Sequence, residues 1–202
     1  MMVSIKTSVY LFDLDATLTK EELLPRIARL IGIEKELQEL TRLNMENPNI
    51  NFETSFRKRV ELLSSIPISD AQYIVETTPM NLKIVEWINL HPNKCFIVTG
   101  NLDLWVQRLF IKYNLQGFTS RASMIDGKLK VDHVVDKSNV IRHFSNHRVV
   151  YIGDGSNDIR IMNLADVGII SEIVHPAPDL LWDQADFVCK TEESLCRILS
   201  RL

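Results

Sequence analysis

Cysteine is scarce in this sequence and is scattered where it occurs. Cys95, Cys189 and Cys196 are odd in number and widely spaced, and no two of them form a Cys-x-x-Cys pair. This spacing argues against both a disulfide framework and a cysteine-based zinc site. We interpret each cysteine as a small packed hydrophobic residue rather than a reactive thiol.

Long hydrophobic runs and a strong charge of one sign are also missing. No apolar run reaches 18 residues, and no charged segment followed by an apolar stretch opens the sequence. We therefore expect neither a membrane-spanning helix nor a signal peptide, and we expect a cytoplasmic protein. The net charge of −3 gives no indication of a nucleic-acid or membrane partner. An anionic ligand would need local positive charge. Nothing in the sequence indicates an oligomeric state.

The 202 residues, 46% of them hydrophobic, are enough for one core carrying a small inserted subdomain. Short apolar segments near residues 8–13, 94–100, 148–155 and 166–170 alternate with helical patterns. This alternation predicts an α/β fold with a Rossmann-like, doubly wound parallel sheet. Residues 20–78 contain helical patterns alone. We expect them to form a small helical cap inserted after the first strand, with residues 1–19 and 79–202 forming the α/β core. Asp126-Gly127 predicts a β-hairpin turn.

Polar residues follow three of the predicted strands, in the stretches "DLDATLT", "TGN" and "GDGSND". The carboxyl ends of parallel strands meet at one edge of a sheet, where ligands bind in such folds. This edge should collect Asp13, Asp15, Thr99, Asp154, Asn157 and Asp158. Crowded carboxylates repel one another unless a cation lies between them. A site with oxygen ligands and free coordination positions for water suits Mg²⁺. We therefore expect a magnesium site, because the spacing is not that of a twelve-residue calcium loop.

A magnesium site beside a phosphate would give these carboxylates separate tasks. Asp13 could act as a nucleophile that forms an aspartyl-phosphate. Asp15, two residues later, could protonate the leaving oxygen and then deprotonate water. Lys137, at the start of a predicted helix, could neutralise charge on the transferred phosphoryl group.

The second strand end could seat the phosphate itself. Thr99 offers a hydroxyl, and the Gly100 and Asn101 amides precede a predicted helix. Each of these features also has a structural interpretation when taken alone. Paired aspartates are common in turns, Thr-Gly is common at helix ends, and a single lysine such as Lys137 is usually a surface residue. Their combination, in order and each at a strand end or helix start, favours a functional site.

With these residues the chain resembles the haloacid dehalogenase superfamily of phosphotransferases. "DLDATLT" is similar to its first motif, "IVTG" to the second, Lys137 to the third and "GDGSND" to the fourth. The resemblance implies Asp13 as nucleophile and Asp15 as general acid and base. It also implies Mg²⁺ bound by Asp13, the backbone carbonyl of Asp15 and Asp154. Asn157 and Asp158 would complete the surroundings of phosphate and metal.

Within that superfamily, "NFETSFRKRVELLSSIPI" together with Glu22 resembles the phosphoserine phosphatases. This closer resemblance implies that Glu22 meets the substrate ammonium and that Arg59 meets its carboxylate. Phe52, and as a further candidate Met45, would pack over the ligand. In the alternative interpretation, the charged run at residues 57–59 is a solvated helix face and Phe52 belongs to the core of the cap.

The sequence departs from that family at its second motif. It has Thr99-Gly100-Asn101 where the family usually shows Ser-Gly-Gly, so the side chain of Asn101 could add a hydrogen bond or narrow the pocket. Our hypothesis is a Mg²⁺-dependent phosphatase for phosphoserine, a small phosphorylated metabolite. One alternative is another small phosphomonoester, such as an amino alcohol or sugar phosphate. The other is a catalytically silent member that binds a phosphorylated ligand, against which the retention of Asp13, Asp15, Lys137 and Asp154 argues.

Overall fold

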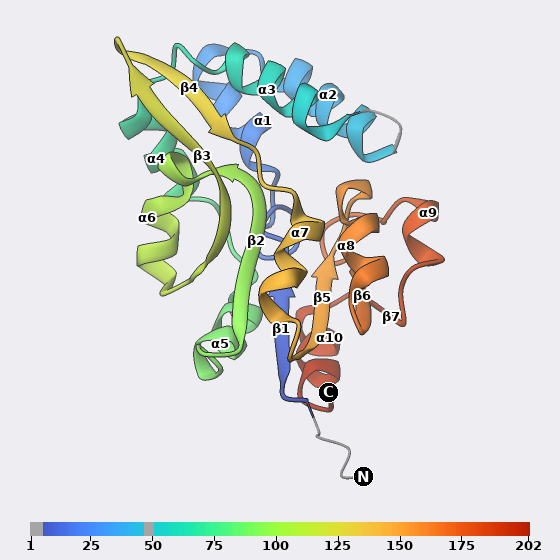
Figure 1. The fold of residues 1–202 in the computed structure, drawn as a ribbon. Coiled ribbons are helices and arrows are strands. Elements are labelled where there is room, and N and C mark those ends of the chain that lie inside the picture. Colours follow the sequence, from blue (N-terminus) through green and yellow to red (C-terminus); the bar gives the residue numbers. More distant parts are fainter. Residues whose placement is uncertain (1–5, 47–50) are drawn as a thin grey trace.

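A seven-stranded sheet forms the centre of the molecule in the computed structural model, which describes residues 6–46 and 51–202. The strand order is β4-β3-β2-β1-β5-β6-β7, and every neighbouring pair is parallel except β3 and β4 (Figure 1). The strands are β1 (Ser8–Phe12), β2 (Cys95–Leu102), β3 (Gly117–Ile125), β4 (Lys128–His133), β5 (Arg148–Gly153), β6 (Val167–Ser171) and β7 (Phe187–Cys189). The α/β class and the mostly parallel sheet expected from the sequence are confirmed.

Helices follow most of the strands and account for the rest of the regular structure. Four of them, together with a short 3₁₀ turn, separate β1 from the next α/β unit: α1 (Leu23–Ala28), η1 (Arg29–Ile31), α2 (Glu34–Glu46), α3 (Phe52–Leu62) and α4 (Ile68–Glu76). The others are α5 (Leu82–Leu90), α6 (Asp103–Tyr113), α7 (Lys137–Val140), α8 (Ile159–Leu164), α9 (Asp179–Trp182) and α10 (Glu192–Leu199), with 3₁₀ turns η2 (Ile141–Phe144) and η3 (Ser156–Asp158). No helix in the described ranges is long and apolar enough to cross a membrane.

The core lies on both faces of the sheet because successive side chains of a strand point to opposite sides. In β1, Tyr10 and Phe12 join a buried cluster that includes residues of α5, α6 and α10. Val9 and Leu11 join a second cluster with residues of α7 and α8. β1 is therefore buried and mostly apolar from Val9 to Phe12, as expected for a strand covered on both faces.

The chain reverses direction across the sheet at β1. β2 and β5 flank this strand, and the chain proceeds through β3 on one side and through β6 on the other. Such a reversal opens a crevice at the carboxyl end of the central strands, which is where open α/β sheets bind ligands. The residue that follows β1 at this crevice is Asp13.

The helical segment α1–α4 lies beyond this end of the strands (Figure 1). α2 contacts η3, α3 contacts β4, and α4 packs along α6. Arg57 of α3 donates a hydrogen bond from Nη1 to the carbonyl of Val131 in β4, at 2.7 Å. The described helices thus cover the crevice. The division of the chain into a core and a cap at residues 20 and 78 stays a prediction.

Two local features differ from the sequence-based expectation. β2 does not end at Thr99-Gly100 but continues to Leu102, after a shift in its pairing with β3 between Val98 and Leu102. Leu102 is fully buried and pairs with Ser120, which explains why the strand resumes there. The short helix α9 was also not expected. By contrast, the hairpin turn at Asp126-Gly127 is confirmed, and both residues adopt positive φ angles, 51° and 73°.

Candidate active site

Asp13 lies directly after β1 and is 4% exposed. Its Oδ1 accepts a hydrogen bond from the backbone N–H of Leu14 at 2.7 Å and pairs with the ammonium of Lys137 at 2.7 Å. Both donors reach the same oxygen, and no described residue donates to Oδ2. The carboxylate is therefore held in one orientation with its second oxygen available for chemistry.

Lys137 is the first residue of α7 and is 6% exposed. Its ammonium lies between two carboxylates, 2.7 Å from Oδ1 of Asp13 and 2.7 Å from Oδ1 of Asp158. Burial lowers the pKa of Lys137, but Asp13 and Asp158 outweigh it and raise the pKa above its usual value. The lysine is therefore a fixed positive charge beside Asp13 rather than a surface residue.

Asp158 is fully buried and accepts four hydrogen bonds. Lys137 and the hydroxyl of Tyr151 donate to Oδ1, at 2.7 and 2.5 Å. The backbone N–H groups of Asp154 and Gly155 both donate to Oδ2, at 3.1 Å. A side chain at Gly153 would collide with this carboxylate, which explains the first glycine of "GDGSND". Asp158 thus anchors the loop of residues 153–158 and orients Lys137. Both of its carboxylate oxygens already accept hydrogen bonds from the protein.

Asp15 is held by two donors from different parts of the chain. Its Oδ1 accepts a hydrogen bond from the backbone N–H of Leu23 at 2.8 Å, and its Oδ2 accepts one from the side-chain amide of Asn101. Burial raises the pKa of Asp15 to about 7, and the carboxylate of Glu22 contributes to the rise. A carboxyl group with this pKa can both give and take a proton near neutrality, as a general acid and base must.

Asn101 also contacts Thr99, the residue expected to offer its hydroxyl to phosphate. The Oγ1 of Thr99 accepts hydrogen bonds from the backbone N–H and the side-chain amide of Asn101, at 3.1 and 3.0 Å. Thr99 is fully buried and does not line the pocket described below. In the structure the hydroxyl of Thr99 therefore positions Asn101, and Asn101 in turn positions Asp15.

The buried carboxylates of Asp13, Asp154 and Asp158 each place an oxygen within 4.8 Å of the others. Burial raises the pKa of Asp13 well above its usual value, and it raises the pKa of Asp154 to about 6. Such a cluster binds protons or a cation to relieve its repulsion. An all-oxygen set of ligands suits Mg²⁺, so the residues fit this ion. Asp13 and Asp154 could hold it directly, whereas the donors on Asp158 favour a supporting role for that residue.

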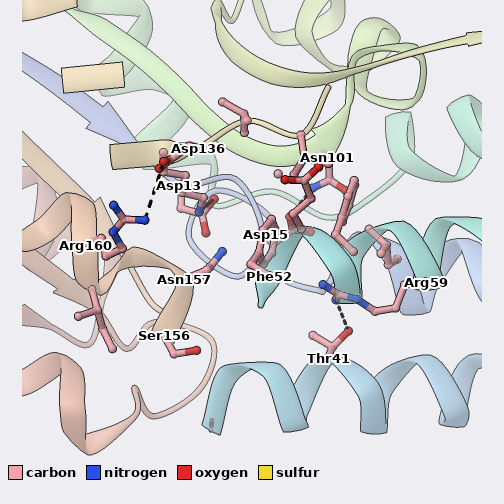
Figure 2. A pocket seen from close by; sticks show the side chains of 18 of the residues that line it. Asp13, Asp15, Thr41, Phe52, Arg59, Asn101, Asp136, Ser156, Asn157 and Arg160 are labelled. Atoms are coloured by element: carbon pink, nitrogen blue, oxygen red, sulfur yellow. Dashed lines mark hydrogen bonds and ion pairs between the residues drawn. The ribbon is translucent and has the colours of Figure 1, made fainter. Parts of the chain in front are cut away.

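A pocket of about 460 Å³ lies between these groups and the helical segment (Figure 2). The site residues expected from the sequence line it, except for Thr99 and Asp158: they are Asp13, Asp15, Glu22, Phe52, Arg59, Gly100, Asn101, Lys137, Asp154 and Asn157. The side chain of Met45 lies outside the described part of the chain. The strand ends and the helical segment therefore converge on one space, as the motifs predict.

Arg59 of α3 is 6% exposed, in contrast to its exposed neighbour Lys58. Its Nη1 donates a hydrogen bond to the hydroxyl of Thr41 at 3.2 Å, and its buried Nε has no hydrogen-bond partner among the described residues. The guanidinium carbon lies 5.9 Å from the ring centre of Phe52 and 6.0 Å from that of Phe56. Because Arg59 is buried, the interpretation of this side chain as part of a solvated face is wrong. No described carboxylate forms an ion pair with it, although Glu22 and Asp15 lie near enough to raise its pKa against the effect of burial.

Phe52 lies close to Gly100 of β2 as well as to Arg59 of its own helix. A Cβ atom at Gly100 would lie only 2.6 Å from Cζ of Phe52. The glycine in "IVTG" thus permits the close approach of α3 to β2. The ring of Phe52 also stacks on that of Phe56, with centres 5.7 Å apart, and both face the same pocket.

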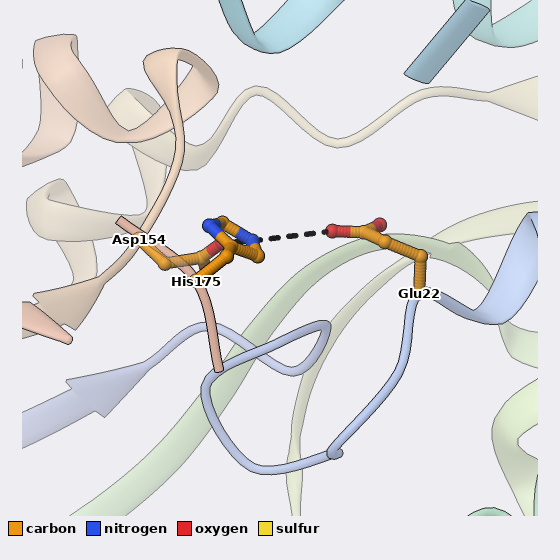
Figure 3. Close-up of side chains that lie close together, drawn as sticks. All are labelled: Glu22, Asp154 and His175. Carbon is orange, nitrogen blue, oxygen red and sulfur yellow. Dashed lines mark ion pairs between the residues drawn. The ribbon is translucent and has the colours of Figure 1, made fainter. Parts of the chain in front are cut away.

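The sequence analysis missed two residues that contact Asp154. Thr17 donates a hydrogen bond from Oγ1 to Oδ1 of Asp154 at 3.1 Å, and its place within "DLDATLT" could have indicated this role. His175 lies between β6 and α9, with Nε2 3.1 Å from Oδ2 of Asp154 and 3.9 Å from Oε1 of Glu22 (Figure 3). The carboxylates of Asp154 and Glu22 raise the pKa of His175 to about 10. No motif or periodicity marks this histidine in the sequence.

Comparison with known proteins agrees with this geometry. The family model of haloacid dehalogenase-like hydrolases matches residues 10–163. A phosphoserine phosphatase of Methanocaldococcus jannaschii is 30% identical over 96% of this chain and 97% of its own length. A substrate-bound phosphoserine phosphatase complex superposes with a TM-score of 0.81 at 28% identity, covering 98% of this chain and 100% of the other. A phospho-aspartyl intermediate analogue of phosphoserine phosphatase superposes with a TM-score of 0.79 at 28% identity, covering 98% of this chain and 99% of the other.

Proposed function

The chain belongs to the haloacid dehalogenase-like hydrolases and is a phosphoric monoester hydrolase, and we propose that it releases L-serine from O-phosphoserine in a Mg²⁺-dependent reaction. The observation that carries the choice of substrate is the buried guanidinium of Arg59, which forms no ion pair with a described residue and whose Nε has no hydrogen-bond partner there, although the carboxylates of Glu22 and Asp15 lie near enough to act on it electrostatically. A buried charge of this kind is costly unless it is paired. A substrate carboxylate would pair it through the two-pronged donor geometry of arginine.

The other functional groups of phosphoserine also have partners in the pocket. Glu22 lines the same space and could accept hydrogen bonds from the substrate ammonium. The phosphate would lie at the strand ends, between Asp13 and Lys137, where the fixed ammonium compensates its negative charge. Phe52 would cover the short carbon chain between these two ends.

The first chemical step would transfer the phosphoryl group to Asp13. Its free Oδ2 attacks phosphorus, and an aspartyl O–P bond forms as the ester P–O bond breaks. The bonding electrons pass to the serine oxygen, which takes a proton from the carboxyl group of Asp15. The pKa of about 7 at Asp15 supports this role, because a substantial fraction of the carboxyl groups holds a proton at neutral pH.

The second step would hydrolyse the aspartyl-phosphate and restore both residues. Asp15, now a carboxylate, takes a proton from water as the water oxygen attacks phosphorus, and the aspartyl O–P bond breaks to release inorganic phosphate. Lys137 remains paired with Asp13 and Asp158 throughout. Mg²⁺, when bound by Asp13, Asp154 and the backbone carbonyl of Asp15, supplies positive charge that offsets the repulsion between phosphate and carboxylates.

Substitution of the proposed nucleophile tests the reaction. We expect the wild-type protein to release inorganic phosphate from phosphoserine only with Mg²⁺, and we expect Asp13→Asn to lower kcat by at least about 10⁴-fold, because an amide is a poor nucleophile. Quenched wild-type protein should carry one acid-stable phosphoryl group by mass spectrometry, and the variant should carry none. Phosphate release by Asp13→Asn at near wild-type rates would contradict covalent catalysis by this residue. A wild-type protein without phosphatase activity would instead favour the silent, ligand-binding alternative.

A comparison of two substrates tests the assignment of Arg59. Phosphoethanolamine has the phosphate and the ammonium of phosphoserine but no carboxylate. We expect Arg59→Ala to raise KM for phosphoserine by about 10²-fold and to change KM for phosphoethanolamine by less than about threefold, since a charged hydrogen-bonded pair contributes roughly 1.5–3 kcal/mol. Lys58→Ala, on the exposed side of α3, is the matched control. Equal losses on both substrates would remove Arg59 from carboxylate recognition and favour another small phosphomonoester.

A further inference from the structure

Glu22, Asp154 and His175 form a second group of potential metal ligands beside the proposed magnesium site. Their ligand atoms all lie within 4.8 Å of one another. Three separate segments bring them together: Asp154 follows β5, Glu22 precedes α1, and His175 lies between β6 and α9 (Figure 3). Asp154 is 2% exposed, so at least one ligand of this group is firmly buried.

The imidazole of His175 has the arrangement of a metal-binding histidine. Its Nδ1 lies 3.1 Å from the backbone carbonyl of Pro176, to which it can donate a hydrogen bond. A backbone carbonyl that accepts from Nδ1 commonly directs Nε2 of a histidine toward a metal. In the metal-free protein the two carboxylates favour a proton on Nε2, and a bound ion would take the place of that proton. Nε2 is buried and, although it is close to both carboxylates, makes no hydrogen bond of normal geometry with either.

We propose that Glu22, Asp154 and His175 bind a transition-metal dication such as Zn²⁺ at a site that adjoins that of Mg²⁺ and shares Asp154 with it. Imidazole nitrogen and carboxylate oxygen are both ligands of Zn²⁺, and a site with three protein ligands leaves a fourth position for water. Mg²⁺ prefers oxygen ligands alone, so the histidine distinguishes the two sites.

An ion can reach this group without passing through the substrate pocket. A second pocket of about 410 Å³ is lined by Glu22 and His175, together with residues of α2 and of the segment 175–178. Glu22 lines both this pocket and the substrate pocket, whereas Asp154 lines the substrate pocket. The three ligands thus stand between two pockets, and the second provides a route for an ion from solvent.

Binding of Zn²⁺ at this site should inhibit the phosphatase. The ion would engage the Glu22 carboxylate that is proposed to meet the substrate ammonium and would share Asp154 with Mg²⁺. This consequence rests on the proposed function, whereas the binding site itself does not. We therefore separate the two in the experiment.

The binding test uses isothermal titration calorimetry of the full chain with Zn²⁺ in the presence of saturating Mg²⁺. We expect one Zn²⁺ per chain, and we expect His175→Gln to weaken binding by at least about tenfold, since even loss of groups that support a metal ligand has this effect. Exposed His133 of β4 provides the control variant His133→Gln, which should bind like the wild type. Glu22→Gln should weaken binding as well, and thermal unfolding of each variant verifies that it is folded. Equal Zn²⁺ affinity in wild type and His175→Gln would overturn the proposal.

A spectroscopic and a kinetic readout complete the test. Co²⁺ in place of Zn²⁺ should give visible absorption bands that are lost in His175→Gln and retained in His133→Gln. With phosphoserine as substrate, added Zn²⁺ should lower kcat/KM of the wild type about tenfold more than that of His175→Gln. Binding and absorption do not depend on catalysis, so they stand even if the proposed substrate is wrong. Binding through His175 without inhibition would overturn the inhibitory role alone.

Discussion

Asn101 is one of the two residues at which the second motif of this chain departs from the pattern usual in the phosphoserine phosphatases that it resembles. Its amide donates to Asp15 and to Thr99, so it links the proposed general acid to the end of β2. Its Oδ1 is buried without a hydrogen-bond partner in the described ranges. The side chain therefore does more than narrow the pocket, because its amide orients the carboxyl group of Asp15, the proposed general acid.

Two substitutions at this position should have unequal effects. Asn101→Gly removes one hydrogen bond from Asp15, which is still held by the N–H of Leu23, and we expect kcat to fall by less than about tenfold. Asn101→Asp keeps the shape but places a second negative charge against Asp15, and we expect kcat to fall by about 10²-fold or more. Steady-state kinetics with phosphoserine measure both. Similar losses in the two variants would contradict the electrostatic argument.

The helix α3 connects the proposed recognition of substrate to the sheet. Phe52, Phe56 and Arg59 project from it toward the pocket, while Arg57 binds the carbonyl of Val131 in β4. The shape of the pocket thus depends on where one helix lies. β4 is the edge strand of the sheet. The hydrogen bond of Arg57 therefore holds α3, which covers the pocket, against the edge of the sheet.

Loss of that connection should impair binding more than stability. In Arg57→Ala we expect kcat/KM for phosphoserine to fall about tenfold, since α3 would no longer be fixed against β4, while the melting temperature changes by less than about 3 °C. Lys58→Ala, which removes an exposed charge from the next position, should leave both quantities unchanged. If Arg57→Ala retained full kcat/KM, the hydrogen bond would have no part in holding the pocket.

The fold concentrates negative charge at the crevice where the chain reverses direction across the sheet. Asp13, Asp154 and Asp158 come from two strand ends and are all nearly inaccessible to solvent. Such burial destabilises the folded protein unless protons, Lys137 or a bound cation offset it. The site is therefore assembled at the expense of stability, and its cation should stabilise the whole fold.

Magnesium should accordingly raise the melting temperature of the metal-depleted protein. Binding to the native state alone stabilises it by about 2.7 kcal/mol at a hundredfold excess over Kd, which corresponds to roughly 5–10 °C for a domain of this size. Calorimetry of chelator-treated protein with and without Mg²⁺ measures this shift. In Asp154→Asn the increase should be less than half as large, because a proposed ligand is lost. An undiminished increase in that variant would place Mg²⁺ elsewhere.

Several features of this protein follow from patterns within short stretches of its sequence. Apolar runs without alternation, such as Val9–Phe12 of β1, predict a sheet covered on both faces, and that sheet is present. Asp126-Gly127 predicts a turn because few other residues accept its positive φ angles, and the turn is present. The motifs around Asp13 and Asp154 could be placed at one edge because parallel strands end on the same side.

Other features depend on contacts between residues that are far apart in the chain. Thr17 and Asp154 form a hydrogen bond across 137 positions, and His175 reaches Asp154 and Glu22 from a loop without a local pattern. The packing of β2, α2 and α3 likewise determines the position of Thr99, the burial of Arg59 and the contacts of Asn101. Local periodicity reflects which face of an element is buried. The partner of a polar side chain depends on which elements meet, and only the folded chain establishes that.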